Sequence, residues 1–409
     1  MHVLLIHQTF ASPDQAGGTR HYELAQNLVR EGHRFTIVTS DLSYLTGKRF
    51  VAREDLETEK TQSGVRVLRA YTYPSLHRSF FWRVVSFLSF MFTSVNMALK
   101  AGPVDLVMGT SPPIFQCLSA WVVGLIRRRP FLLEIRDLWP EFAIDIGVLK
   151  NPWLIRLSRW LERFLYARAN HILVNSPAYK EYLIKKGVAE EKITLIPNGV
   201  DPGMFDPDAR GEQVRQALGL NGHFVITYAG ALGLANDIET ILGAADRLRN
   251  EPRIHFLLVG DGKERVNLES LADKLRLPNI TFMGSRPKSE MREILAASDA
   301  CVATLKDIPM FRTTYPNKVF DYMAAGRPIV LAIDGVIREV VEAAQAGVCV
   351  SPGDPQAIAE AVRYIFDHGE ERDLMSHRGR VYVERYFNRA DQSRQFVDLL
   401  EKLVARKKR

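Results

Sequence analysis

A lysine and an aspartate stand one helical turn apart in the last third of the chain. The stretch YPNKVFDYMAAGRPIV, Tyr315 to Val330, predicts a helix with Lys318 in its first turn and Asp321 three residues later. A helix start offers free N–H groups and a positive dipole end to a phosphate, and a lysine adds a full charge. A carboxylate one turn on can accept two hydrogen bonds from a ribose. As an exposed i,i+3 pair the two residues would add only about 0.2–0.5 kcal/mol, so we interpret them as nucleotide-binding residues.

Two glycine turns precede this helix in the second half of the chain. The turn YAGALG includes Gly230, and the turn GDGK places Lys263 at the start of the next helical pattern. Glycine lets a backbone approach a phosphate closely, and lysine supplies a compensating charge. We therefore include Gly230 and Lys263 in the predicted phosphate site. The alternative is a pair of ordinary strand-to-helix turns with a solvated lysine.

Paired glycines also follow the first apolar run of the chain. Gly17, Gly18 and Arg20 lie between that run and a helical pattern that starts near Tyr22. Because loops in this position usually carry function, we predict that the three residues contact a phosphate or another ligand. The spacing is not that of a dinucleotide fingerprint, and an ordinary loop is the alternative.

The segment LEIRDLWPE crowds ionisable side chains behind another apolar run. Arg136 and Asp137 follow the run directly, with Glu134 before them and Glu141 after them. Clustered ionisable groups at the carboxyl end of a strand are candidates for catalysis. We predict that Arg136 and Asp137 are catalytic residues. The alternative is a salt-bridged turn that ends at Pro140.

Short apolar runs that alternate with helical patterns must position these residues. The runs are Val3–Ile6, Phe35–Val38, Val65–Leu68, Leu106–Met108, Phe131–Ile135, Ile172–Val174, Phe224–Tyr228, Phe256–Val259, Ile280–Met283, Ala300–Ala303, Pro328–Leu331 and Val348–Val350. Apolar strands between helices predict parallel sheets covered on both faces, and the pattern restarts after the turn-rich IPNGVD. We predict an α/β fold with two Rossmann-like, doubly wound parallel-sheet domains facing a cleft, residues 1–196 and 197–386. A helix in residues 387–409 could cross back to the first domain.

Composition narrows the class of protein. The 409 residues are 46% hydrophobic and 25% charged, as in a globular protein with real cores. Three widely spaced cysteines form neither a metal motif nor a disulfide framework, so we expect a reducing compartment and no metal. The opening MHVLLIHQTF is expected to be a strand and not a signal peptide. A net charge of +7 suits nucleic acid, anionic lipid or phosphorylated substrates without choosing among them.

These motifs together resemble family 4 glycosyltransferases of the GT-B fold. The segments HQTFASPDQAGGTRHYELAQNLVREGH, RDLWPE, IPNGVD, YAGALG, VGDGKE and PNKVFDYMAAGRPIV occur in the order that the family shows. The resemblance covers nearly the whole chain and is closest to the bacterial O-antigen and capsule branch, which includes N-acetylfucosamine transferases. It implies an N-terminal acceptor-binding domain, a C-terminal domain that binds a nucleotide sugar, and retention of configuration. No cofactor is expected beyond this co-substrate, which we expect to be a UDP-sugar.

Several positions depart from the family pattern. By the resemblance, Asp321 replaces the second of two paired acids and binds the ribose. The first acid, which contacts the donor sugar, would fall at Thr313. The family's arginine and lysine after the first strand of the second domain fall near Ala231 and Asn236, which are neutral. The donor contacts therefore differ from those of typical members.

Other residues must then supply charge to the donor diphosphate. We choose Lys318, Lys263 and Arg20. The family's usual active-site histidine aligns with Arg136, which leaves Asp137 as its ionisable neighbour. No acidic cluster argues for a metal, so these cations are expected to neutralise the leaving group.

Two helical patterns suggest contact with a membrane. Phe80–Leu99 is apolar almost all round, but Arg83 and Asn96 cut its apolar stretch below the roughly 20 residues that a spanning helix needs. In Pro152–Tyr166, an apolar face is flanked by arginines, as in interfacial helices. That predicted face is made of Trp153, Leu154, Leu157, Trp160, Leu161, Phe164 and Leu165. The alternative is that both patterns are buried helices of the first domain.

The sequence thus predicts a cytoplasmic enzyme at the inner face of the plasma membrane. It would transfer a hexosyl or N-acetylhexosaminyl group from a nucleotide sugar to a lipid-linked saccharide in O-antigen or capsule biosynthesis, with no nucleic acid partner. One alternative is a sugar-nucleotide epimerase of the same fold. The other is a non-catalytic, membrane-bound partner subunit that has lost its donor contacts.

Overall fold

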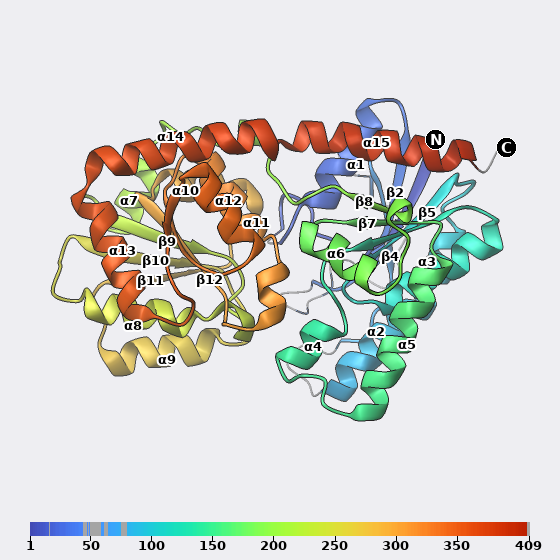
Figure 1. Cartoon of the computed structure of the whole chain (residues 1–409), viewed down its shortest axis with the longest axis horizontal. Helices are drawn as coiled ribbons and strands as arrows, with labels where there is room; N and C mark the ends of the chain where they lie inside the picture. The colour runs from blue at the N-terminus through green and yellow to red at the C-terminus, as the bar shows by residue number, and fades with distance from the viewer. Residues whose placement is uncertain are drawn as a thin grey trace. The chain divides into compact units, whose positions relative to one another are not determined.

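The computed structural model describes residues 1–15, 17–43, 47, 49, 59–60, 64–74 and 80–406. They form two compact units (Figure 1). Unit 1 contains Met1–Ser12, Gly18–Pro197 and Ala390–Arg409, and unit 2 contains Pro13–Gly17 and Asn198–Arg389. The chain thus changes units after Pro197 and Arg389, near the predicted boundaries at 196 and 386.

Unit 1 is built on one eight-stranded sheet. The strand order is β3-β4-β2-β1-β5-β6-β7-β8, and every pair is parallel except β3 with β4. The strands are β1 (His2–Ile6), β2 (Arg34–Ser40), β3 (Glu59–Lys60), β4 (Arg66–Ala70), β5 (Leu106–Ser111), β6 (Phe131–Ile135), β7 (His171–Val174) and β8 (Ile193–Leu195). The chain reverses its winding between β1 and β5, so the carboxyl ends of these strands flank a topological switch point, where such folds bind ligands.

The helices of unit 1 cover this sheet. They are α1 (Arg20–Arg30), α2 (Phe80–Leu99), α3 (Phe115–Arg127), α4 (Glu141–Asp145), α5 (Pro152–Arg168), α6 (Pro177–Lys185) and α15 (Arg389–Arg406). The last of these returns from unit 2, because Phe396, Leu400 and Leu403 lie in the same core as Val3 and Leu106.

Helix α2 is the one candidate membrane span among the residues that the structure describes. Its length and composition over Phe81–Leu99 would allow a crossing. It nevertheless packs within unit 1 against α3 and β4, and Phe90 and Ser94 are fully buried. A helix of a soluble domain can satisfy the same length and composition.

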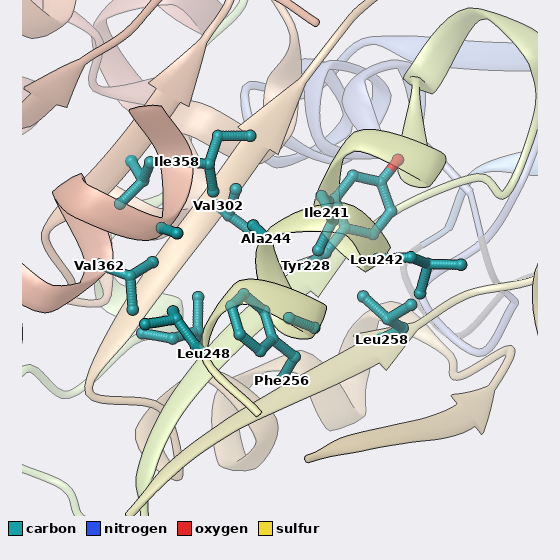
Figure 2. Packing of buried hydrophobic residues seen from close by; sticks show 14 of the residues in the cluster. Tyr228, Ile241, Leu242, Ala244, Leu248, Phe256, Leu258, Val302, Ile358 and Val362 are labelled. Carbon is teal, nitrogen blue, oxygen red and sulfur yellow. The ribbon is translucent and has the colours of Figure 1, made fainter. Parts of the chain in front are cut away.

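Unit 2 is a second doubly wound sheet. Its strand order is β11-β10-β9-β12-β13-β14, and all pairs are parallel. The strands are β9 (Phe224–Ala229), β10 (Ile254–Val259), β11 (Ile280–Gly284), β12 (Ala300–Thr304), β13 (Ile329–Ala332) and β14 (Gly347–Cys349). The switch point lies between β9 and β12, and a core that includes Tyr228, Phe256 and Ile358 packs beneath the helices (Figure 2).

The helices of unit 2 lie on both faces of its sheet. They are α7 (Glu212–Ala217), α8 (Ile238–Arg247), α9 (Arg265–Leu275), α10 (Met291–Ala296), α11 (Asn317–Ala324), α12 (Val336–Ala344), α13 (Pro355–Asp367) and α14 (Gly369–Tyr386). The predicted fold class, two doubly wound α/β domains, is confirmed. All twelve predicted strands occur, and among the described residues the structure adds two short strands that were not predicted, β3 and β8.

Candidate active site

Lys318 lies in the first turn of α11 and points to the carboxyl end of β9. Its Nζ donates to Tyr228 Oη at 2.7 Å and to Asn236 Oδ1 at 3.3 Å, and it lies 4.0 Å from the centre of the Tyr228 ring. No carboxylate in the described part of the chain pairs with it. Burial lowers the pKa of Lys318 to about 7. The site therefore holds a half-buried amine without a counter-charge.

Glycines leave room for this amine. A Cβ on Gly230 would lie 2.8 Å from Lys318 Nζ, and a Cβ on Gly260, whose φ is +150°, would overlap the carbonyl of Gly230. Gly230 N also donates to Val259 O at 2.9 Å. Sequence reasoning identified Gly230, and the structure brings it to Lys318.

The exposed Lys263 belongs to the neighbouring turn. Leu232 N donates to Asp261 O at 3.0 Å, and Glu264 N donates to Leu232 O at 3.0 Å. These bonds tie the turn that carries Lys263 to the turn after Gly230. Lys263 makes no ion pair within the described chain.

Asp321, one turn after Lys318, forms an ion pair that the sequence did not reveal. Its Oδ2 accepts from Lys288 Nζ at 2.5 Å, and Lys288 also lies 5.6 Å from the centre of the Phe205 ring. The i,i+3 pair between Lys318 and Asp321, considered above as the structural alternative, is not formed. Nothing around Lys288 in the sequence indicated this contact.

The first glycine loop divides between the two units. Gly17, with φ +144°, belongs to the segment Pro13–Gly17 of unit 2, and Pro13 O accepts from Ser289 N at 3.3 Å. Gly18 belongs to unit 1 and precedes α1. Both glycines are exposed.

Arg20, predicted to contact a donor phosphate, lies inside unit 1. It is buried, and its guanidinium donates to Glu134 Oε1 at 3.2 Å, Pro197 O at 2.7 Å and Ile196 O at 2.8 Å. A buried arginine held in this way anchors the interior of unit 1 and does not offer its charge to a donor phosphate. These contacts do not support the predicted role of Arg20 at a donor phosphate, and a motif position alone does not tell which way a side chain turns.

Arg136 and Asp137 follow β6 at the carboxyl edge of the unit 1 sheet. Arg136 Nη2 donates to His7 Nε2 at 3.1 Å, and its backbone N–H donates to Ser111 O at 3.0 Å. Burial raises the pKa of Asp137 to about 6, although Arg136 opposes the shift. No hydrogen bond reaches the Asp137 carboxylate from any residue that the structure describes.

Behind Arg136 lies a buried cluster of His7, His21 and Glu134. The sequence singled out Glu134 and the segment that begins at His7, but not their contact. The rings of His7 and His21 are 4.6 Å apart, and His21 Nε2 bonds to Glu134 Oε2. Burial and the Arg136 charge hold the pKa of His7 well below its usual range. Burial alone would raise the pKa of Glu134, but His21, Arg20 and Arg136 together hold it well below normal. His7 is thus a neutral acceptor for Arg136, and its place at the end of β1 was the available signal.

The described residues contain no group of three or more His, Cys, Asp or Glu that could hold a metal ion. Each unit instead presents a cation at a switch-point edge: Lys318 in unit 2 and Arg136 in unit 1. In unit 1 the cation is accompanied by a carboxylate of raised pKa, Asp137.

Two doubly wound units in one chain, each with charged groups at its switch point, are the architecture of GT-B glycosyltransferases. Residues 16–199 match the family model described as glycosyl transferase 4-like domain, and residues 223–368 match the model described as glycosyl transferases group 1. The chain therefore belongs to the family 4 glycosyltransferases of GT-B fold.

Known proteins agree with this assignment over the whole chain. The WcaI protein of Escherichia coli (strain K12), assigned as a colanic acid biosynthesis glycosyl transferase, is 23% identical over 97% of this chain and 98% of its own. The sucrose-phosphate synthase of Thermosynechococcus elongatus superposes with a TM-score of 0.79 at 20% identity, over 99% of both chains. The Alr3699/HepE protein of Anabaena, solved with UDP, superposes with a TM-score of 0.73 at 18% identity, over 98% of this chain and 100% of its own. At these sequence identities, the similarity to the solved structures supports the fold alone.

Proposed function

We propose that this glycosyltransferase uses a UDP-sugar and transfers a hexosyl or N-acetylhexosaminyl group to a lipid-linked saccharide in surface polysaccharide biosynthesis. One observation carries the donor assignment: Lys318 is half-buried beside Gly230 and lacks a counter-charge within the described chain. A desolvated cation of this kind is complementary to an anion such as a diphosphate. The UDP complex of the Anabaena protein supports the choice of nucleotide.

In this proposal the donor side of the reaction belongs to unit 2. Lys318 and Lys263 neutralise the charge of the diphosphate, and Gly230 lets the diphosphate approach the backbone closely. Asp321 accepts hydrogen bonds from the ribose hydroxyls. Asp321 must then exchange part of its contact with Lys288 for the ribose. Arg20 is left out of the site, because its guanidinium is bonded inside unit 1.

The acceptor side of the reaction belongs to Arg136 and Asp137. The bond from the sugar C1 to the leaving phosphate oxygen breaks, and the acceptor oxygen bonds to C1 on the same face. Because the acceptor attacks the face from which the diphosphate departs, configuration is retained, and the acceptor proton passes to the leaving diphosphate. Arg136 and Asp137 orient the acceptor hydroxyl, and holding two reactants in a fixed mutual orientation supplies much of the rate enhancement in such reactions.

We place the enzyme in the cytoplasm at the inner face of the plasma membrane, where lipid-linked saccharides are extended. The full-length likeness to WcaI, assigned to colanic acid synthesis, supports a surface polysaccharide, such as O-antigen or capsule, as the product. The N-acetylfucosamine branch of the family remains one choice of donor sugar.

Calorimetry of the purified full chain with UDP, GDP and uridine tests the donor assignment. We expect UDP to bind, and we expect Lys318→Ala to weaken UDP about 10- to 150-fold while uridine changes little, because the lost contact is charge-assisted. Equal losses for both ligands would mean that Lys318 acts through folding. If wild type binds neither UDP nor GDP, a non-catalytic partner subunit is the better description. Release of an epimerised sugar nucleotide from donor alone would identify an epimerase.

A further inference from the structure

The outer faces of α3 and α5 in unit 1 carry large apolar side chains that no described residue covers. On α5, Trp153, Leu157 and Trp160 are 76%, 58% and 54% exposed, and on α3, Leu125 is 63% exposed. The spacings of four and three residues place the α5 side chains on one side of that helix. They form a stripe along the helix and are not isolated surface residues.

The apolar face that the sequence predicted for α5 is divided by the fold. Leu161 and Leu165 are buried in unit 1, so the prediction that they extend the exposed face was wrong. Leu154 is 41% exposed and stays outside. The two tryptophans are not core residues, which removes the main objection to an exposed role for this helix.

Ring contacts join the stripe on α5 to α3. Trp160 stacks on Phe164 with ring centres 5.5 Å apart, and Phe164 meets the edge of Trp121 at 5.0 Å. Leu125 follows Trp121 by one helical turn. We call the resulting patch the aromatic surface, and its members are Trp121, Leu125, Trp153, Leu157, Trp160 and Phe164.

Arginines surround the aromatic surface, and no exposed acid lies on either helix. Arg156, Arg163 and Arg168 are exposed on α5, and Arg128 is exposed just after α3. The neighbouring Arg159 and Arg129 are exposed as well, but they pair with Glu141 at 2.9 Å and with Asp105 at 3.9 Å. Helix α3 contains no acid, and the one acid of α5, Glu162, is fully buried and bonded to Lys186 at 2.6 Å. The patch therefore combines interfacial side chains with a net positive rim.

We propose that the aromatic surface docks this protein on an anionic lipid bilayer. Tryptophans and leucines enter the boundary between headgroups and acyl chains, and arginines at the edge meet lipid phosphates. A second copy of the chain is a poorer occupant, because a two-fold contact through this patch would bring identical arginine rims together. This docking would hold unit 1, the proposed acceptor-binding unit, at the layer that contains a lipid-linked acceptor.

Flotation of the full chain with vesicles tests this docking without any nucleotide. We expect binding to phosphatidylcholine vesicles that contain phosphatidylglycerol, little binding to phosphatidylcholine alone, and release in high salt. Arg156→Gln with Arg163→Gln should weaken binding about 25-fold, from about fivefold for each charge. Trp153→Ser with Trp160→Ser should weaken it about 100-fold, from about tenfold for each side chain.

Matched variants in unit 2 separate docking from general effects. Val266 is 74% exposed on α9 and Arg363 is exposed on α13, so Val266→Ser and Arg363→Gln should leave flotation unchanged. All variants should keep the wild-type melting temperature. Absence of flotation in wild type would overturn the proposal. If wild type is instead a dimer that does not bind vesicles, and the tryptophan variant is a monomer, the aromatic surface is a dimer interface and the proposal is also overturned. Because UDP binding is measured separately, failure here leaves the donor assignment standing.

Discussion

At the scale of single residues, the proton on Lys318 is expected to control donor affinity. Its pKa of about 7 in the free protein means that the amine loses its charge as the pH rises above neutrality. A diphosphate binds the charged form, so binding above this pKa must take up a proton. We expect UDP affinity to fall by up to tenfold per pH unit between about pH 7.5 and 9, where a terminal phosphate with a second pKa near 6 is already ionised.

Calorimetry in two buffers of different ionisation enthalpy measures this proton uptake directly. Lys318→Arg is the matched control, because a guanidinium stays charged over the same range. That variant should bind UDP with little pH dependence. Wild-type affinity that is flat from pH 7.5 to 9 would show that Lys318 is already fully charged in the free protein.

Asp321 is assigned to the donor ribose and is paired with Lys288, and two variants distinguish these roles. If Asp321 binds the ribose, Asp321→Ala should weaken UDP by about 1.5–3 kcal/mol and leave inorganic pyrophosphate unaffected. Lys288→Met removes the observed ion pair but keeps the carboxylate. If both variants weaken the binding of UDP and of pyrophosphate equally, Asp321 acts by positioning Lys288 and not by binding the ribose.

Asp137 is expected to act on the acceptor and not on the donor. Its pKa of about 6 means that it is mostly ionised at pH 7 and becomes protonated as the pH falls through 6. The rate of sugar transfer should therefore decline on the acid side with a midpoint near that value. Because Asp137 orients the acceptor hydroxyl while the diphosphate takes the proton, Asp137→Asn should lower kcat about 100-fold, remove this decline and leave UDP affinity unchanged. A loss of UDP affinity instead would move Asp137 to the donor side.

At the scale of elements, α11 carries the donor site, and the phenol of Tyr322 helps to tie it to β9. Ala229 N donates to Tyr322 Oη at 2.7 Å, and Tyr322 is fully buried. Tyr322→Phe should leave that N–H unsatisfied and lower the stability of unit 2 by about 1–3 kcal/mol. The urea midpoint of unit 2 measures the loss. Tyr386→Phe, at a position that is 53% exposed, should change nothing.

The sequence predicted the elements better than it predicted the contacts of the site. Strands such as β9 and β13 are continuous apolar runs, which parallel sheets require, so their existence and positions were readable. Strand β8, only three residues long, ends directly before the turn-rich IPNGVD and was not predicted. The pairing of Asp321 with Lys288 and the burial of Arg20 depend on chain segments far apart in sequence, which local patterns do not encode. Periodicity likewise located α5 but could not tell Trp160, outside, from Leu161, inside.

At the scale of the whole molecule, the end of the chain completes the unit where the chain begins. Phe396, Val397, Leu400 and Leu403 of α15 lie in the core of unit 1, so removal of residues 390–409 would open that core. Burial of four such side chains contributes about 6–12 kcal/mol, which is comparable to the stability of an entire domain. We therefore expect the truncated chain to lose the folded state of unit 1.

Unit 2 should survive this truncation, because its sheet and core are formed within Asn198–Arg389. The residues assigned to the diphosphate, Lys318, Lys263 and Gly230, all belong to that unit. The truncated protein should therefore show the melting transition of unit 2 alone and bind UDP with nearly wild-type affinity. Because the aromatic surface belongs to unit 1, the folded unit 2 should not float with anionic vesicles. Calorimetric scans with and without UDP follow both units. Loss of UDP binding together with unit 1 would show that the donor site needs unit 1. A single transition that includes both units would show that unit 1 still folds without residues 390–409.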